Sequence, residues 1–112
     1  MNLPPFHLAI PVHNLQECRE FYRDHIGCTE GRSSEQWVGF NFYGHQLVIH
    51  YKPKTEEETV QVNKVDGKHV PVPHFGVVLS MEDFKTLASR MASRNTKFII
   101  CLLYTSPSPR DT

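Results

Sequence analysis

The sequence predicts an α+β fold made of two β-α-β-β-β units, the second of which ends after its third element. Two near-copies of one apolar segment, residues 5–12 and 73–79, carry this prediction, because each begins with proline and has a histidine near its start. A helical pattern with a capping residue follows each copy. His7 and His74 take equivalent places in the two copies, which indicates an internal repeat.

The first unit begins with strict alternation over residues 6–12, where every second residue is apolar and His7 lies on the other face. This period predicts a half-buried strand. Asn14 is a good helix N-cap with Glu17 three residues later, and Gly27 is a typical left-handed helix end. The spacing of apolar residues therefore predicts a helix over 15–26.

The rest of the first unit is predicted to be three strands, over residues 28–32, 36–43 and 46–51. Residues 33–35 form the expected first turn, and Gly44-His45 fits a tight hairpin connection between the last two strands. Trp37 and Asn41 share one face of the middle strand, where lining a cavity and ordinary packing both remain open.

The second unit follows a polar stretch, residues 53–70, which is interpreted as a linker with a turn at Asp66-Gly67. Residues 74–79 then predict a strand, and Ser80 caps a helix that Asn95 ends in the left-handed conformation. Residues 97–100 begin another strand. Module one therefore covers about 5–52 and the partial module two 71–100, within one domain over residues 1–100.

Residues 101–112 are expected to be a non-native tail. Residues 101–111 resemble the conceptual translation of a transposase-type sequencing adapter in one reading frame. On this interpretation the gene continues past Ile100 in sequence that differs from the tail, and the segment is excluded from fold reasoning. The alternative is a genuine disordered tail with a Ser-Pro repeat.

Composition excludes several classes of partner. The 112 residues carry 12 basic and 12 acidic side chains, so no charge excess favours nucleic acid. No apolar run approaches the ~20 residues of a membrane span, and the N-terminus lacks the pattern of a signal peptide. Three cysteines without metal-binding spacing indicate reduced thiols, which favours a cytoplasmic location.

Taken in order, these motifs resemble the vicinal oxygen chelate (VOC) superfamily, which includes glyoxalase I, extradiol dioxygenases, and fosfomycin- and bleomycin-resistance proteins. The matching stretches are residues 6–12, the run Cys18-Arg19-Glu20-Phe21-Tyr22 with Ile26-Gly27, and residues 73–79. The resemblance covers residues 5–100. It implies paired βαβββ modules, the glyoxalase/dioxygenase-like fold, whose sheets curl around a cavity.

The resemblance also implies a metal site. His7 and His74 match ligands on the first strand of each module, and His50 lies on the fourth strand, where glyoxalase-type members place a carboxylate. The carboxylate of the eighth strand would lie beyond Ile100. Sites in this superfamily are built by pairing modules within one chain or across a homodimer, and both arrangements stay open here.

The residue types agree with a divalent metal. His7 and His74 both lie opposite the apolar face of their segments, and imidazole binds Fe, Mn, Zn and Ni. Two histidines, a carboxylate and open positions are the arrangement of non-haem Fe(II) oxygenases, so Fe(II) is favoured. His50 is the expected catalytic residue, with third ligand, acid–base group and cavity lining as its open roles. The other histidines are expected in turns, a linker or a helix end, without a role in the site: His13, His25, His45 and His69.

These expectations define a metal-dependent enzyme, first extradiol dioxygenase-like and second glyoxalase-like, that chelates two vicinal oxygens of a small-molecule substrate. The alternative is a metal-free module that sequesters a ligand, as in bleomycin-resistance proteins, which typically lack the histidines at the strand starts. A third reading is an inactive fragment, because missing strands would leave sheet edges and apolar surface exposed.

Overall fold

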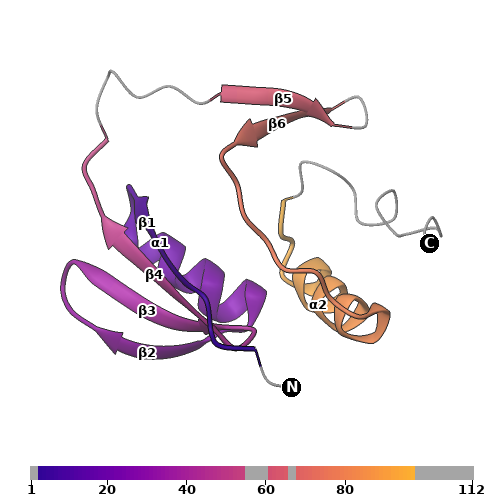
Figure 1. The fold of residues 1–112 in the computed structure, drawn as a ribbon, viewed down its shortest axis with the longest axis horizontal. Helices are drawn as coiled ribbons and strands as arrows, with labels where there is room; N and C mark the ends of the chain where they lie inside the picture. The colour runs from indigo at the N-terminus through magenta and orange to yellow at the C-terminus, as the bar shows by residue number, and fades with distance from the viewer. Residues whose placement is uncertain (1–2, 55–60, 66–67, 98–112) are drawn as a thin grey trace. The chain divides into compact units, whose positions relative to one another are not determined.

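The computed structural model describes residues 3–54, 61–65 and 68–97, with only the backbone path described for 61–65 and 68–72. The chain divides into two compact units, Met1–Glu56 and Glu57–Thr112. Each unit is described by itself, and Figure 1 shows the elements of both.

The first unit contains one mixed sheet of four strands in the order β1-β4-β3-β2. Its strands are β1 (His7–Val12), β2 (Thr29–Ser33), β3 (Trp37–Phe42) and β4 (His45–Tyr51). β1 runs parallel to β4, whereas β3 is antiparallel to both of its neighbours. The predicted β-α-β-β-β order of this unit is confirmed, and with it the α+β class.

The helix between β1 and β2 has the predicted extent and caps but two kinds of winding. An α-helix, α1 (Leu15–Glu20), continues directly into a π-helix, η1 (Phe21–Ile26). The Asn14 Oδ1 atom accepts a 2.9 Å hydrogen bond from the backbone N–H of Glu17. Gly27 ends the helix at φ 89°, as its lack of a Cβ allows.

The hairpin between β3 and β4 turns one residue earlier than predicted. Phe42 pairs with His45, so the two-residue turn is Tyr43-Gly44 and His45 already belongs to β4. Both turn residues have positive φ, 52° and 88°, as a type I′ turn requires. The Asn41 Oδ1 atom accepts a 2.7 Å hydrogen bond from the Gly44 N–H, which stabilises the turn.

The core lies between α1–η1 and one face of the sheet (Figure 1). Val38 and Ile49 are completely buried, and Leu47 and Phe40 lie beside them. The helix contributes four partly buried side chains to this cluster: Leu15, Cys18, Tyr22 and Ile26. Within residues 3–54, no helix covers the opposite face of the sheet, which is therefore its open face.

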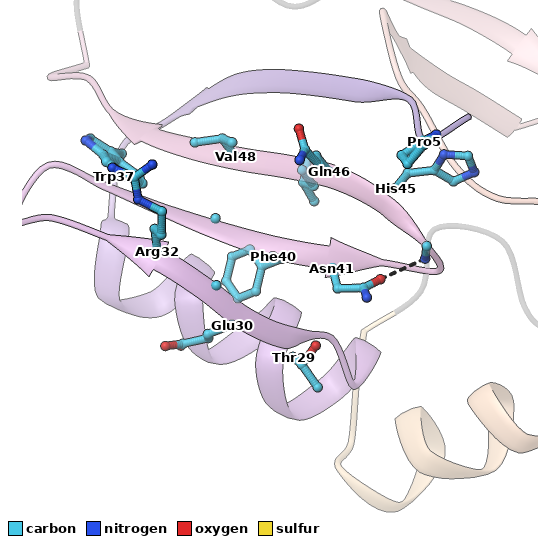
Figure 2. Close-up of a pocket in the computed structure, with 14 residues that line it drawn as sticks. Pro5, Thr29, Glu30, Arg32, Trp37, Phe40, Asn41, His45, Gln46 and Val48 are labelled. Carbon is cyan, nitrogen blue, oxygen red and sulfur yellow. Dashed lines mark hydrogen bonds between the residues drawn. The ribbon is translucent and has the colours of Figure 1, made fainter. Parts of the chain in front are cut away.

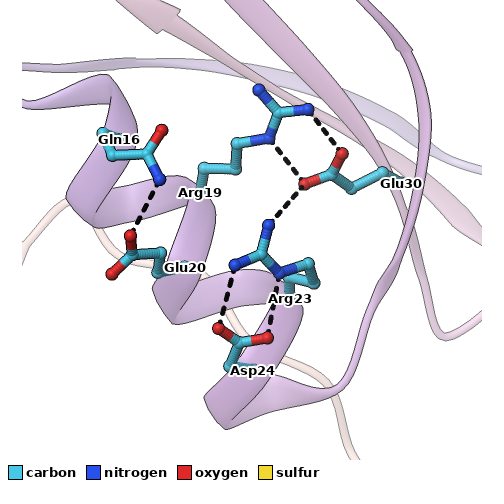
Figure 3. Close-up of polar contacts among 6 residues, drawn as sticks. All are labelled: Gln16, Arg19, Glu20, Arg23, Asp24 and Glu30. Atoms are coloured by element: carbon cyan, nitrogen blue, oxygen red, sulfur yellow. Dashed lines mark hydrogen bonds and ion pairs between the residues drawn. The ribbon is translucent and has the colours of Figure 1, made fainter.

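A bidentate ion pair ties the helix to the outermost strand, β2 (Figure 3). The Nε and Nη2 atoms of Arg19 each donate a 2.7 Å hydrogen bond to a carboxylate oxygen of Glu30. The Nη1 atom of Arg23 lies 3.6 Å from the same carboxylate. The hydrogen bond from Arg19 lowers the pKa of Glu30 from its ordinary value.

The second unit contains a hairpin that the sequence analysis did not predict. Strand β5 (Gln61–Val65) lies inside the stretch 53–70 interpreted as a linker, and it pairs antiparallel with β6 (Lys68–Val72), which extends from this stretch into module two. The sequence did not predict these strands, because a largely polar stretch without a clear period resembles a loop. The predicted turn at Asp66-Gly67 lies outside the described residues.

The predicted strand over residues 74–79 is wrong, because these residues are not assigned to any strand. β1, its counterpart in the repeat, has β4 as its single sheet neighbour. Between α2 (Met81–Ser93) and the end of the described residues, no strand corresponds to β4. Within this segment, exposure alternates over residues 76–79, with Val78 fully exposed and Leu79 half-buried.

Helix α2 confirms the predicted capping pattern. The Ser80 hydroxyl accepts a 3.2 Å hydrogen bond from the backbone N–H of Asp83, and Asn95 follows the helix at φ 57°. Four apolar residues at helical spacing along α2 are half-buried: Phe84, Leu87, Ala88 and Met91. The strand expected to continue from Lys97 and the tail at 101–112 lie outside the described residues. None of the described helices has the length and apolarity to cross a membrane.

Candidate functional site: the open face of the first sheet

Each of the four strands of the first sheet contributes one polar side chain to a single row across the sheet. In register, His7 of β1 lies beside Gln46 of β4, which lies beside Asn41 of β3 and then Thr29 of β2. The His7 Nδ1 atom is 3.0 Å from the Gln46 Oε1 atom. The strand period puts these side chains on the open face, since their neighbours in sequence face the core.

The middle of the open face is a depression, because its side chains are shorter than those in the rows at the two ends of the face. Ala9, Val48 and Gly39 are in register there, and the pairing of β2 with β3 is interrupted between Glu30 and Ser33. A Cβ atom at Gly39 would lie 3.2 Å from the carbonyl oxygen of Arg32. Any side chain at this position would therefore crowd β2 and raise the floor.

The far end of the face is formed by a third row, Pro11, His50 and Trp37. The rings of His50 and Trp37 are tilted against each other with centroids 6.4 Å apart. His50 lies four strand positions beyond His7, which corresponds to about 13 Å along the strands. Because side chains stand roughly perpendicular to a sheet, this register does not favour His50 as a third ligand beside His7.

A hollow of about 540 Å³ lies over the low middle of this face and continues around the β3–β4 turn (Figure 2). Arg32, Trp37, Asn41, Gln46 and Val48 are among its lining residues. Trp37 and Asn41, whose roles were left open, both line this hollow, and their place in a metal-binding cavity stays a prediction. Figure 2 shows Arg32 and Trp37 at one end of the hollow and Gln46 and His45 toward the other.

The predicted metal ligands belong to different units. His7 lies on the open face of the first unit, and His74 is exposed in the second. Their convergence on one ion stays a prediction. In the described part of the chain, no group of three or more His, Cys, Asp or Glu side chains is arranged to hold a metal ion.

Three residues that line the hollow were not predicted from the sequence. Gln46 is the partner of His7, Arg32 lines the hollow, and the His45 Nδ1 atom accepts a 2.8 Å hydrogen bond from the Phe6 N–H. Alternation along the strand could place Gln46 on the open face. The register that brings it to His7 depends on pairing between distant strands.

The fold and this face define an α+β protein of the glyoxalase/dioxygenase-like fold. Among solved structures, the chain is similar to a glyoxalase/bleomycin resistance protein/dioxygenase from Alicyclobacillus acidocaldarius, with 28% sequence identity and a TM-score of 0.62. That match covers 81% of this chain but 63% of the other, so this chain spans less than two thirds of its structural neighbour.

A second similar structure is an integron cassette protein from the mobile metagenome of a Halifax Harbour sewage outfall. It has a TM-score of 0.55 at 17% identity, and the match covers 80% of this chain and 69% of that protein. This likeness concerns the fold alone. No family model matches the sequence, and no curated protein matches it significantly.

Proposed function

We propose that this chain is part of a metal-dependent enzyme in which His7 and His74 bind one divalent ion, with Fe(II) favoured over Mn, Zn and Ni. The first reaction class is extradiol dioxygenase-like and the second glyoxalase-like. The observation that carries the proposal is the contact between His7 Nδ1 and the amide oxygen of Gln46.

This contact prepares His7 for metal binding. With the Gln46 amide oriented as in the structure, its oxygen accepts the proton of Nδ1–H at 3.0 Å. The lone pair of the neutral ring then lies on Nε2, the atom that would bind the ion. Histidine ligands usually donate their other N–H to an oxygen in this way, which fixes the tautomer and the orientation of the ring.

Other residues of the open face would hold the substrate and transfer protons. The bound ion would supply Lewis-acid chemistry to two vicinal oxygens of the substrate. The low floor at Gly39 and Val48 leaves room for the body of a small molecule. His50 is the proposed acid–base residue, and its position about 13 Å along the strands from His7 restricts it to groups at the substrate's far end.

The test measures binding of Fe(II), Zn(II) and Mn(II) to the purified chain under anaerobic conditions, by elemental analysis and by titration. His7→Ala and His74→Ala should each weaken binding by at least about tenfold, the lower end of the loss seen when even an outer partner of a metal ligand is removed. His13→Ala is the matched control, because His13 lies outside the proposed site and bonds the Lys52 carbonyl. Equal binding by all three variants would contradict the metal site.

A metal-free ligand-binding module is the second candidate, supported by the hollow of about 540 Å³ within the first unit. On this alternative, small molecules bind the open face equally well with and without a chelator. Metal titration and ligand titration therefore separate the two functions, since the enzyme requires both and the binding module only the second.

A further inference from the structure

Several polar side chains that line the hollow present hydrogen-bond donors to it. The Asn41 Oδ1 atom is occupied by the Gly44 N–H at 2.7 Å, and the Gln46 Oε1 atom by His7 at 3.0 Å. Each amide therefore keeps its NH₂ group for a ligand. The indole N–H of Trp37 is also a donor and cannot accept a hydrogen bond.

Arg32 adds a positive charge that no carboxylate of the hollow neutralises. Glu30 is the acidic residue among those that line it, and its carboxylate is held by Arg19 and Arg23 from the helix that covers the core face. Within the described residues, the Arg32 guanidinium makes no ion pair. An arginine fork matches the geometry of a carboxylate, to which it donates two parallel hydrogen bonds.

The floor and the end of the hollow suit a flat body. Gly39 and Val48 form a low surface, and the half-exposed indole of Trp37 rises at the end where Arg32 lies (Figure 2). Aromatic rings favour offset-stacked or edge-to-face contacts with such a side chain.

We propose that the hollow binds a small planar molecule that carries a carboxylate, with the carboxylate on Arg32 and the flat body over Gly39 and Val48 beside Trp37. This inference gives a substrate class for the proposed function, on which it rests for its place in a reaction. Binding to the hollow itself involves residues of the first unit alone and requires no metal. The two proposals can therefore fail separately.

The probe is benzoate, titrated into the full chain in the presence of a chelator, with benzamide as the uncharged analogue of equal shape. Trp37 is the single tryptophan of the sequence, so its indole N–H gives one unambiguous signal in a ¹H–¹⁵N spectrum. We expect benzoate to shift this signal and to bind at least about tenfold more tightly than benzamide, as a charge-assisted bidentate pair implies.

Arg32→Gln should remove the preference for benzoate, and Arg32→Lys should keep part of it. Arg23→Gln is the control, since it removes the same charge from the helix on the covered face. Gly39→Val retains Arg32 but fills the floor, so it should weaken both probes. Unchanged far-UV circular dichroism verifies folding of each variant.

Four results would overturn the proposal. Three of them are equal affinity for benzoate and benzamide in the parent chain, an equal loss of benzoate binding in Arg23→Gln and Arg32→Gln, and unchanged binding in Gly39→Val. The absence of any probe binding would overturn it as well, whereas loss of metal binding in the His7 variant with benzoate binding intact would leave it standing. That last result would concern the metal site alone.

Discussion

The two copies of the repeat begin alike in sequence and differ in structure. Residues 7–12 form β1, whereas residues 74–79 are not assigned to a strand. Val12 is 8% exposed in the first copy, whereas its counterpart in the second copy, Leu79, is half-buried. The helices that follow are capped in the same manner by Asn14 and Ser80. The local sequence therefore gives a capped helix after both copies, whereas only the first copy forms a strand.

The difference lies in where each element finds its hydrogen bonds. A helix satisfies its backbone within the segment, apart from its ends. A strand needs a neighbour, and the neighbour of β1 is β4, which comes about forty residues later in the chain. The described residues after α2 contain no counterpart of β4. The same apolar alternation thus gives a strand only where its partner is present.

The largest expected effect comes from the buried core of the first unit, compared with the exposed second copy of the repeat. Ile49→Ala removes a completely buried side chain and should lower the free energy of unfolding by about 2–5 kcal/mol. Val78→Ala, at a fully exposed position, should change it by less than about 0.5 kcal/mol. Urea unfolding followed by circular dichroism and Trp37 fluorescence measures both. Similar losses in the two variants would show that the second copy is packed as well.

The capping residues should be equivalent in the two copies, in contrast to the strands. Asn14→Ala and Ser80→Ala each leave a backbone N–H without its cap, which costs about 1 kcal/mol. Circular dichroism and urea unfolding should show the loss in both variants. Asn14→Ser and Ser80→Asn keep a capping oxygen and serve as controls. A loss in one helix alone would mean that the two helix starts are not alike.

The ion pair between the helix and β2 makes the stability of the first unit depend on pH. Because Arg19 lowers the pKa of Glu30 below its ordinary 4.5, the pair stabilises the fold above that pH. The contribution is lost as the pH falls through the lowered pKa. Since the pair is partly exposed, Glu30→Gln should cost about 1 kcal/mol or less at pH 7, and less at pH 3.

Unfolding midpoints in urea at the two pH values measure this difference. Glu35→Gln is the control, because Glu35 is exposed in the turn between β2 and β3. A cost of Glu30→Gln that stays constant between pH 7 and pH 3 would contradict the role of the carboxylate charge.

The smallest effect concerns the two left-handed residues that end the helices, Gly27 at φ 89° and Asn95 at φ 57°. Among the residues with a side chain, asparagine is one of those that best tolerate this conformation. Gly27→Asn and Asn95→Gly should therefore each change the free energy of unfolding by only about 0.5 kcal/mol. Gly27→Ala should cost more, about 1 kcal/mol, because alanine is strained at positive φ. Equal effects of Asn and Ala at position 27 would contradict this account.

The sequence was sufficient for features that depend on neighbours along the chain. It predicted the helix limits from Asn14 and Gly27, the common face of Trp37 and Asn41 on β3, and the start of α2 at Ser80. It missed the exact turn at Tyr43-Gly44, because a tyrosine at positive φ is unusual.

Features that depend on pairing could not be predicted in this way. The contact between His7 and Gln46 follows from the parallel register of β1 and β4, which alternation does not determine. The low floor at Gly39 depends on the irregular pairing of β2 with β3. The hairpin of β5 and β6 is formed by polar segments whose pattern resembles a loop. The candidate site was therefore predicted at His7 but not at Arg32 or Gln46.

The π-winding of η1 means that the first helix holds more chain than an α-helix of equal length along its axis. Each hydrogen bond of a π-helix joins residues five apart in sequence, whereas an α-helix joins residues four apart. Each π-helical hydrogen bond therefore encloses one residue more than an α-helical one. Tyr22 illustrates this, because its carbonyl accepts from the N–H groups of both Gly27 and Cys28. We therefore expect a chain shortened by one residue between Glu20 and Gly27 to close into a regular α-helix. We expect this shortening to leave β2 in place.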